Sequence, residues 1–338
     1  MNDIYKSVLG CFLGAAVGDA MGAPTETMPI AYIKKYYNGY VKSFLECPNF
    51  VISAGRNVGC VTDDFSLAYY LAKEIIKSEG EISTAVSDKS ILSWYEAEIY
   101  NDMLGPTLWE RICLLKSDKK TSQKNLFIDN NNATNGAAMK VFPAGLISGG
   151  SVDKAINNAI LLSENSHPNS SALAGACAIS ASISKAISCT DLNAIVEAGL
   201  KGAREGDRYG CKIGKQLATP SVERNITFAV EIALKNNDLE KTMYEISSLI
   251  GSSMMIHQTI SAVYGILVAA KGKTMNSILG GVNIGNDTDT IASIIGAIVG
   301  TMNKFDSFPK DYITIINQAN GYDLCKLAKD FCKYLQKS

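Results

Sequence analysis

The stretch NIGNDTDTIASIIGAIVG, residues 283–300, places two aspartates and two threonines directly before an almost purely apolar run. The apolar run predicts a buried helix that begins at these polar residues. Two explanations for Asp287 and Asp289 are open. They cap the helix by accepting hydrogen bonds from its free N–H groups, or they bind a metal ion through their carboxylate oxygens.

A second helix start has the same character. In VTDDFSLAYYLA, Thr62, Asp63 and Asp64 precede apolar residues at helical spacing. A cap uses one side chain, so each helix start carries a surplus carboxylate beside a hydroxyl. Adjacent aspartates repel each other unless a cation neutralises them. If the two starts meet in space, their oxygens suit Mg²⁺ or Mn²⁺ in octahedral geometry, and the sequence leaves that meeting open.

The composition excludes several classes of protein. The net charge is −1, from 32 basic and 33 acidic residues, so bulk charge does not favour nucleic-acid or membrane-surface binding. Nine cysteines without a CxxC pair are typical of reduced thiols in a cytosolic protein. The N-terminal apolar stretch has a weak basic end and carries Asp19 where a signal-peptide cleavage site needs small neutral residues. We therefore expect a cytoplasmic protein.

Helical periodicity dominates the chain. Leu67, Leu71 and Ile75 fall on one row of a helix, and the same pattern recurs to the C-terminal apolar run, whereas hairpin signals are nearly absent. We predict one compact all-α domain over residues 1–338. The segments 38–62, 117–136 and 203–222 are predicted loops, and polar loops of this length tend to form sites or lids.

With other motifs absent, the candidate functional groups are side chains that offer oxygen ligands. Only two histidines occur, His167 and His257, and HExxH, CxxC and P-loop motifs are absent, so a zinc site built on several histidines is excluded. Glu26, which follows Asp19 in GDAMGAPTE, and Asp102 in NDMLGPTLWE are further candidate carboxylates. The alternative for these acidic residues is an ordinary surface loop.

Together these pieces resemble a known family. GAAVGDAMGAPTE, TDD, DMLGPT, TNGAAMKVFPAGL, NSHPNS and GNDTDTIASIIGAIVG occur in this order between residues 10 and 300. The chain resembles the ADP-ribosylglycohydrolase family, whose members remove ADP-ribose from arginine, serine or dinitrogenase reductase. The resemblance implies a compact orthogonal helical bundle, which agrees with the helical periodicity.

The resemblance also implies a site with two divalent metal ions, Mg²⁺ or Mn²⁺. Its two halves match Thr62, Asp63 and Asp64 at the first helix start, and Asp287, Asp289 and Thr290 at the second. Glu26 and Asp102 match carboxylates with catalytic roles. The residues that match a loop around the substrate's phosphates and distal ribose are Asn135, Gly136, Ala137, Ala138 and Met139. His167 matches a histidine that lines the same cleft.

Three positions depart from the family pattern. Phe65 replaces a usual threonine, Asn286 a usual glycine and Lys140 a usual arginine. None of them removes an implied metal ligand. Phe65 and Lys140 affect the expected substrate more than the metals, because we expect them to alter the cleft at its adenylate end.

The resemblance implies a metal-dependent hydrolase that cleaves a glycosidic bond of an ADP-ribosylated protein or an ADP-ribose-like small molecule. Such a reaction passes through an oxocarbenium-like state and needs an activated water, which two metals can polarise while they bind ribose hydroxyls. Glu26 or Asp102 would take the water's proton, and N–H groups of a loop at 135–138 would bind a diphosphate. Alternatives are a hydrolase of nucleosides or other ribosyl metabolites, and a non-catalytic ADP-ribose-binding or structural member.

Overall fold

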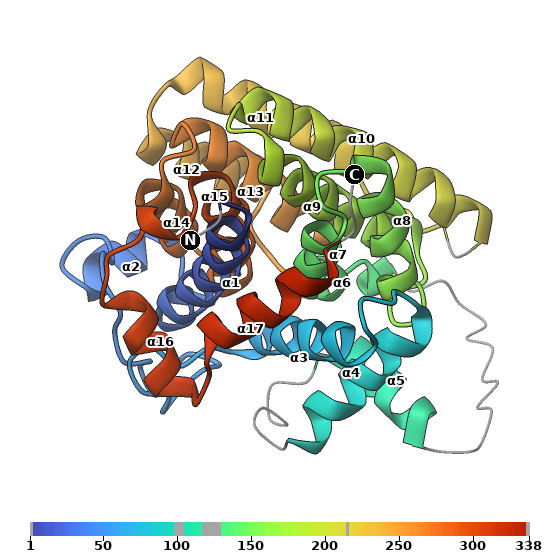
Figure 1. Cartoon of the computed structure of the whole chain (residues 1–338). Coiled ribbons are helices and arrows are strands. Elements are labelled where there is room, and N and C mark those ends of the chain that lie inside the picture. Colours follow the sequence, from blue (N-terminus) through green and yellow to red (C-terminus); the bar gives the residue numbers. More distant parts are fainter. Residues whose placement is uncertain (1–2, 98–104, 117–129, 214–215, 336–338) are drawn as a thin grey trace.

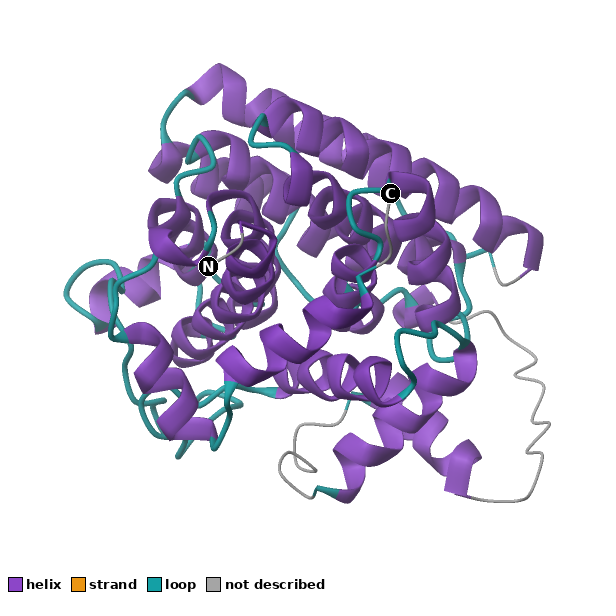
Figure 2. Ribbon diagram, viewed as in Figure 1, coloured by secondary structure: helices purple, strands orange, loops and turns teal. Residues whose placement is uncertain are grey.

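The computed structural model describes residues 3–97, 105–116, 130–213 and 216–335. Within these ranges the chain is helical and has no β-strand, and the one β-bridge joins Thr134 to Met255 (Figure 2). The prediction of an all-α fold is confirmed. Asp102 falls outside the described ranges.

Seventeen α-helices lie within the described ranges (Figure 1). The first half of the chain contains α1 (Asp3–Gly22), α2 (Ile30–Tyr36), α3 (Asp63–Lys77), α4 (Thr84–Glu96), α5 (Pro106–Lys116), α6 (Gly136–Lys140), α7 (Phe142–Ile147) and α8 (Val152–Ser163). The second half contains α9 (Ser170–Ser188), α10 (Leu192–Ile213), α11 (Val222–Asn236), α12 (Leu239–Leu249), α13 (Ile256–Ala269), α14 (Thr274–Asn283), α15 (Thr288–Asn303), α16 (Tyr312–Asn320) and α17 (Leu324–Phe331).

The first helix and α15 pack backbone against backbone (Figure 1). Small residues spaced four apart form this contact, Gly10, Gly14, Gly18 and Gly22 on α1, and Ala292, Gly296 and Gly300 on α15. A Cβ atom on Gly14 would lie 2.1 Å from the carbonyl oxygen of Gly296, so no side chain fits between the helices. The contact brings the end of α1 to the start of α15, where a Cβ on Gly22 would lie 2.5 Å from the Cα of Asp289.

A similar contact corrects one sequence prediction. Residues 203–213, predicted as part of a loop, belong to helix α10. Gly202 and Gly206 lie on the face of α10 that packs on α9, where a Cβ would come within 2.3 Å of Cys177 O and 2.4 Å of Leu173 O. The glycines are therefore required by close packing, and the predicted loop is reduced to the short connection before α11.

The other predicted loops differ in outcome. Residues 38–62 contain no helix or strand, as predicted. Most of the segment 117–136 lies outside the described ranges, and its end forms a 3₁₀ turn, Asn130–Asn132, and the start of α6.

Two apolar helices are long enough to cross a membrane by length and composition alone. They span Asp3–Thr25, which includes the 3₁₀ turn Ala23–Thr25, and Ser170–Ser188. Their apolar windows are 100% and 89% buried inside the fold. Both helices therefore serve as core helices of the bundle. All nine cysteines are free thiols, as the sequence predicts.

The α1–α15 contact yields a stability prediction. Gly14→Ala will lower the free energy of unfolding by more than about 2 kcal/mol, although alanine favours a helix over glycine by about 1 kcal/mol, because the methyl group must push two backbones apart. Urea denaturation measures the change. Gly105→Ala, which has no heavy atom within 4 Å of the added Cβ, should stay within about 0.5 kcal/mol of the parent protein. Equal values for the two variants would contradict the packing argument.

Candidate metal centre

The start of α3 is capped by two side chains, which leaves Asp64 surplus to capping. Thr62 is the N-cap residue, and its Oγ1 accepts a hydrogen bond from the N–H of Asp64 at 3.2 Å. The buried carboxylate of Asp19, on α1, accepts from the N–H groups of Thr62 at 3.0 Å and Phe65 at 2.9 Å. The Oδ1 atom of Asp64 is buried and has no hydrogen-bond partner. Capping alone therefore does not explain the two adjacent aspartates.

The start of α15 shows the same surplus. Asp287 occupies the N-cap position without making a side-chain cap. Its carboxylate instead accepts from Asn135 Nδ2 at 2.5 Å and from Thr290 Oγ1 at 3.1 Å. Asp289 is 3% exposed, and its buried Oδ1 has no hydrogen-bond partner. Asn286, which precedes Asp287, has a φ of 65°, a left-handed conformation that favours glycine and that asparagine tolerates. This explains how asparagine can replace the glycine that is usual in the family at this position.

Both helix starts line one cleft of about 180 Å³. Its acidic and hydroxyl-bearing residues are Glu26, Asp63, Asp64, Thr107, Thr134, Asp287, Asp289 and Thr290. Carboxylate oxygens of Glu26, Asp287 and Asp289 lie within 4.8 Å of one another. Thr62 is fully buried behind this wall. The structure therefore brings together helix starts that are more than two hundred residues apart.

The cluster is electrostatically unfavourable by itself. Burial and the charge of Asp289 raise the pKa of Glu26 to about 10 and that of Asp287 to about 8. The same two causes hold the pKa of Asp64 well above its ordinary value. Burial raises the pKa of Asp289 to about 6, and backbone N–H groups oppose that rise. Each carboxylate would ionise more readily beside a positive charge.

The donor set fits divalent cations that prefer oxygen. Glu26 Oε2, Asp64 Oδ1 and Asp289 Oδ1 are buried oxygens without a hydrogen-bond partner. Among the described residues, no lysine or arginine lines the cleft to neutralise them. Hard oxygen ligands in this number match Mg²⁺ or Mn²⁺ better than softer metals. The residues present therefore fit the implied metals.

Asp19 belongs to this site although the sequence did not assign it a role. It is fully buried on α1, which corrects the surface-loop alternative for this residue. Burial and the charge of Asp289 raise its pKa to about 8, while the N–H groups of Thr62 and Phe65 lower it. An aspartate among glycines, alanines and valines in a long apolar helix was the available signal, because such a buried carboxylate needs partners.

The predicted phosphate loop is a short helix. Residues 136–140 form α6, in which the N–H groups of Ala138 and Met139 donate to Asn135 O at 2.8 and 3.1 Å. Asn135 N donates to Met254 O, so two of the N–H groups expected to bind a diphosphate at 135–138, those of Asn135 and Ala138, are used inside the protein. Ala137 and Ala138 are fully buried.

Several residues without a carboxylate also line the cleft. Asn135, Gly136, Met139 and His167 line the cleft. Ile52 and Met254, which the sequence gave no reason to select, also line it and are 60% and 51% exposed. The cleft therefore joins a buried acidic floor to a partly apolar rim.

Phe65 and Lys140 do not line the cleft described above. Phe65 is fully buried and stacks on Phe142, with ring centroids 6.2 Å apart. Lys140 is 1% exposed. Both side chains turn into the core, so neither contacts a ligand in this cleft, and the expectation that they alter its adenylate end stays a prediction.

Comparisons with known proteins agree with this architecture. A sequence model of the family described as ADP-ribosylglycohydrolase matches residues 1–338. The uncharacterized protein YegU of Escherichia coli (strain K12) is 28% identical over 343 residues, covering 98% of each chain. An uncharacterized protein of Archaeoglobus fulgidus is 28% identical over 292 residues, covering 86% of this chain and 85% of the relative.

A solved structure shares the fold. The chain described as an ADP-ribosylglycohydrolase-related protein complex matches with a TM-score of 0.68 at 17% identity, covering 99% of this chain and 100% of that chain. At this identity the match supports the fold alone.

The carboxylate cluster predicts how stability depends on pH and metal. Below the ordinary pKa values of 3.8 for aspartate and 4.5 for glutamate, the carboxyls are protonated in the folded and the unfolded protein, and the folded protein has its full stability. That stability is lost as the pH rises through the raised pKa values of the folded protein, about 6 for Asp289, about 8 for Asp287 and about 10 for Glu26. The melting temperature of the metal-free protein will therefore fall between about pH 5 and about pH 8, and Mg²⁺ will raise it more at the higher pH.

Matched variants separate this effect from general surface charge. Glu26→Gln should raise the melting temperature of the metal-free protein at about pH 8 and reduce the gain from Mg²⁺, because it removes one repelling carboxylate. Asp207→Asn, an exposed change on α10, should leave both quantities unchanged. A melting temperature that is insensitive to Mg²⁺ at both pH values would argue against the metal centre. Scanning calorimetry with and without a chelator provides the measurement.

Proposed function

Because this chain belongs to the ADP-ribosylglycohydrolase family, we propose that it is a metal-dependent hydrolase of ADP-ribosyl compounds. The bond cleaved is the N- or O-glycosidic bond at the anomeric carbon of the ribose, in an ADP-ribosylated protein or an ADP-ribose-like small molecule. The observation that carries this proposal is the meeting of two acidic helix starts and Glu26 in one cleft, with three buried carboxylate oxygens unpartnered. We further propose that the protein acts in the cytoplasm.

Two divalent ions, Mg²⁺ or Mn²⁺, would be held by residues of the two helix starts, namely Thr62, Asp63, Asp64, Asp287, Asp289 and Thr290. When bound, the ions would bind vicinal ribose hydroxyls and lower the pKa of a water molecule. The chain's part is to hold the ligands in place. Asn135 and Thr290 fix the carboxylate of Asp287 by hydrogen bonds, and Asp19 fixes the start of α3 through Thr62 N and Phe65 N.

Glu26 is proposed to take the proton of the attacking water. It follows the 3₁₀ turn at the end of α1, lines the cleft, and has a free Oε2 beside Asp287 and Asp289. Glu26 is 9% exposed, so little bulk water competes for the proton of its carboxyl. A positive charge nearby would lower its raised pKa into the range where it can accept a proton at neutral pH. A second catalytic role for Asp102 remains a proposal from the family resemblance.

The size of the site supports an extended substrate. Thr107 and His167 line the metal cleft and also a second cavity of about 140 Å³ beside it. The second cavity is lined further by polar side chains, among them Arg111, Asn132 and Asn165. A ligand that enters the metal cleft with its ribose thus has polar surface available beyond His167, which favours an ADP-ribosyl group over a bare nucleoside.

A panel of ligands tests the substrate class. In the presence of Mg²⁺, ADP-ribose should raise the melting temperature of the protein, whereas adenosine, inosine and ribosylamines should raise it less, because only ADP-ribose occupies both cavities. Differential scanning fluorimetry gives the ranking. Stabilisation by a nucleoside alone would favour a nucleoside hydrolase, and an absence of turnover for every ligand that binds would favour a non-catalytic binding protein.

Substitution of Glu26 tests its role in the reaction. Glu26→Gln should lower turnover of an ADP-ribosylated substrate by about 10²- to 10⁴-fold, the usual contribution of a general base, while ADP-ribose still binds. Glu81→Gln, an exposed change before α4, is the matched control and should retain parental turnover. Full activity of Glu26→Gln at saturating Mg²⁺ would remove Glu26 from the mechanism.

A further inference from the structure

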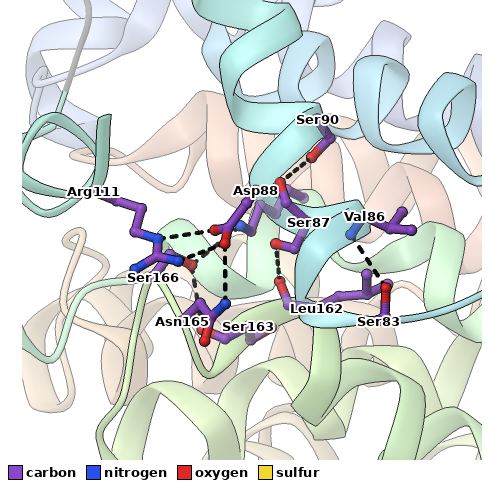
Figure 3. Close-up of polar contacts among 11 residues, drawn as sticks. Ser83, Val86, Ser87, Asp88, Ser90, Arg111, Leu162, Ser163, Asn165 and Ser166 are labelled. Carbon is purple, nitrogen blue, oxygen red and sulfur yellow. Dashed lines mark hydrogen bonds and ion pairs between the residues drawn. The ribbon is translucent and has the colours of Figure 1, made fainter. Parts of the chain in front are cut away.

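The second cavity, beside the metal cleft, has a cationic side chain in its wall. Arg111, on α5, lines this cavity of about 140 Å³, and Thr107 and His167 line both the cavity and the metal cleft. The guanidinium of Arg111 donates to Asp88 from Nε at 2.9 Å and from Nη2 at 2.5 Å (Figure 3). Its side chain is 20% exposed. Two hydrogen bonds to one carboxylate hold the planar guanidinium in a fixed orientation.

The pairing with Asp88 leaves part of the guanidinium free to bind a ligand. Nε and Nη2 each give one N–H to Asp88, and no other described residue accepts a hydrogen bond from Arg111. The N–H groups of Nη1 and the second N–H of Nη2 therefore stay available. Asn165, which also lines the cavity, donates from Nδ2 to Asp88 at 3.2 Å, and this leaves one N–H of its amide available as well.

The buried charges behind this wall favour an anion. Lys140 is 1% exposed, and its Nζ donates at 3.2 Å to the hydroxyl of Ser166, another residue that lines the cavity. Lys140 forms no salt bridge with any described residue. Burial lowers its pKa, Asp88 raises it and Arg111 lowers it, to about 8, so the amine is mainly an ammonium at neutral pH. Two cations therefore share the carboxylate of Asp88.

One acidic residue also lines the second cavity. Glu110 lies on the exposed side of α5, where water and salt screen its charge. The carboxylate of Asp88 does not line the cavity. The less exposed part of the wall thus presents N–H donors beside a net positive charge, which is the arrangement that binds phosphate oxygens.

The N–H groups expected to bind a diphosphate leave a need for such donors. Those of Asn135 and Ala138 are used inside the protein. Thr107 and His167 line both hollows, so a ligand whose ribose enters the metal cleft can extend past them toward Arg111.

We propose that Arg111, oriented by Asp88, is a specificity-determining residue that binds a phosphate group in the second cavity, with Asn165 as a further donor. The binding of an anion follows from the donors and charges of this cavity alone. Its use for the diphosphate of an ADP-ribosyl group rests on the proposed function.

Titration calorimetry of the metal-free full-length protein with inorganic pyrophosphate tests the anion site. Metal is left out because pyrophosphate chelates Mg²⁺. The parent protein should bind pyrophosphate, and Arg111→Gln should weaken that binding by about 10- to 100-fold, as expected for a lost hydrogen bond to a charged group. Arg111→Lys, which keeps the charge without the planar fork, should recover only part of the affinity. Arg224→Gln, an exposed change on α11, should bind as the parent does.

Two further variants separate anion binding from folding. Arg111→Gln leaves Asp88 without its cation, so the double variant Arg111→Gln with Asp88→Asn, which removes both charges, serves if the single variant fails to fold. Glu110→Gln should bind pyrophosphate at least as tightly as the parent, because it removes the carboxylate from the cavity wall. An absence of pyrophosphate binding by the parent, or parental affinity in the Arg111 variants, would overturn the proposal.

A second titration, with Mg²⁺ present, tests the link to the substrate. Arg111→Gln should weaken the binding of ADP-ribose and leave that of adenosine unchanged, because adenosine has no phosphate. Parental affinity for ADP-ribose in this variant, with pyrophosphate binding lost, would show that the cavity takes free phosphate and would remove Arg111 from substrate choice. If pyrophosphate binding depends on Arg111 and the parent does not bind ADP-ribose, the anion site stands and the proposed function fails.

Discussion

The backbone contact between α1 and α15 is the constraint on which the rest of the structure depends. Without side chains between them, the two helices lie as close as their carbonyl oxygens allow, and their relative position is fixed along the full stripe of glycines. At its end, Thr288 Oγ1 donates to Gly22 O at 2.9 Å, so the start of α15 is attached to the last turn of α1. One turn earlier on α1, Asp19 holds the start of α3. One helix therefore sets the position of both acidic helix starts.

The same contact explains how a fold tolerates a cluster of buried carboxylates. Glu26, Asp64, Asp287 and Asp289 oppose folding when they are ionised, as their raised pKa values indicate. The free energy that offsets this charge repulsion comes from the burial of apolar side chains along helices that are almost entirely inside the protein, such as α9 and α15. The candidate site thus lies where the local charges are unfavourable and the surrounding helices are almost entirely buried.

The sequence predicted features that depend on local residue patterns, and it failed where the role of a residue depends on a segment that packs against it in the fold. Helical periodicity sufficed for the fold class. The surplus of aspartates over capping needs pointed to Asp64 and Asp289 as candidate metal ligands, and both have a buried Oδ1 without a hydrogen-bond partner. Residues 203–213 were predicted as a loop, although they belong to α10, because nothing in their own segment shows that α9 packs against its glycines. Asp19 was visible as a misplaced charge, but its two N–H partners belong to a helix start forty residues later.

The cleft has an acidic floor and an uncharged wall at His167, so its negative charge is confined to the floor. The floor at Asp64 and Asp289 consists of carboxylate oxygens, which attract cations and, through them, hydroxyl oxygens. The wall at His167 carries a neutral imidazole, because burial lowers the pKa of this side chain to about 3, so it adds no positive charge that would compete for the carboxylates. In the proposed reaction, cations held at this floor would bind the ribosyl hydroxyls, which would orient the sugar with those hydroxyls toward Asp64 and Asp289.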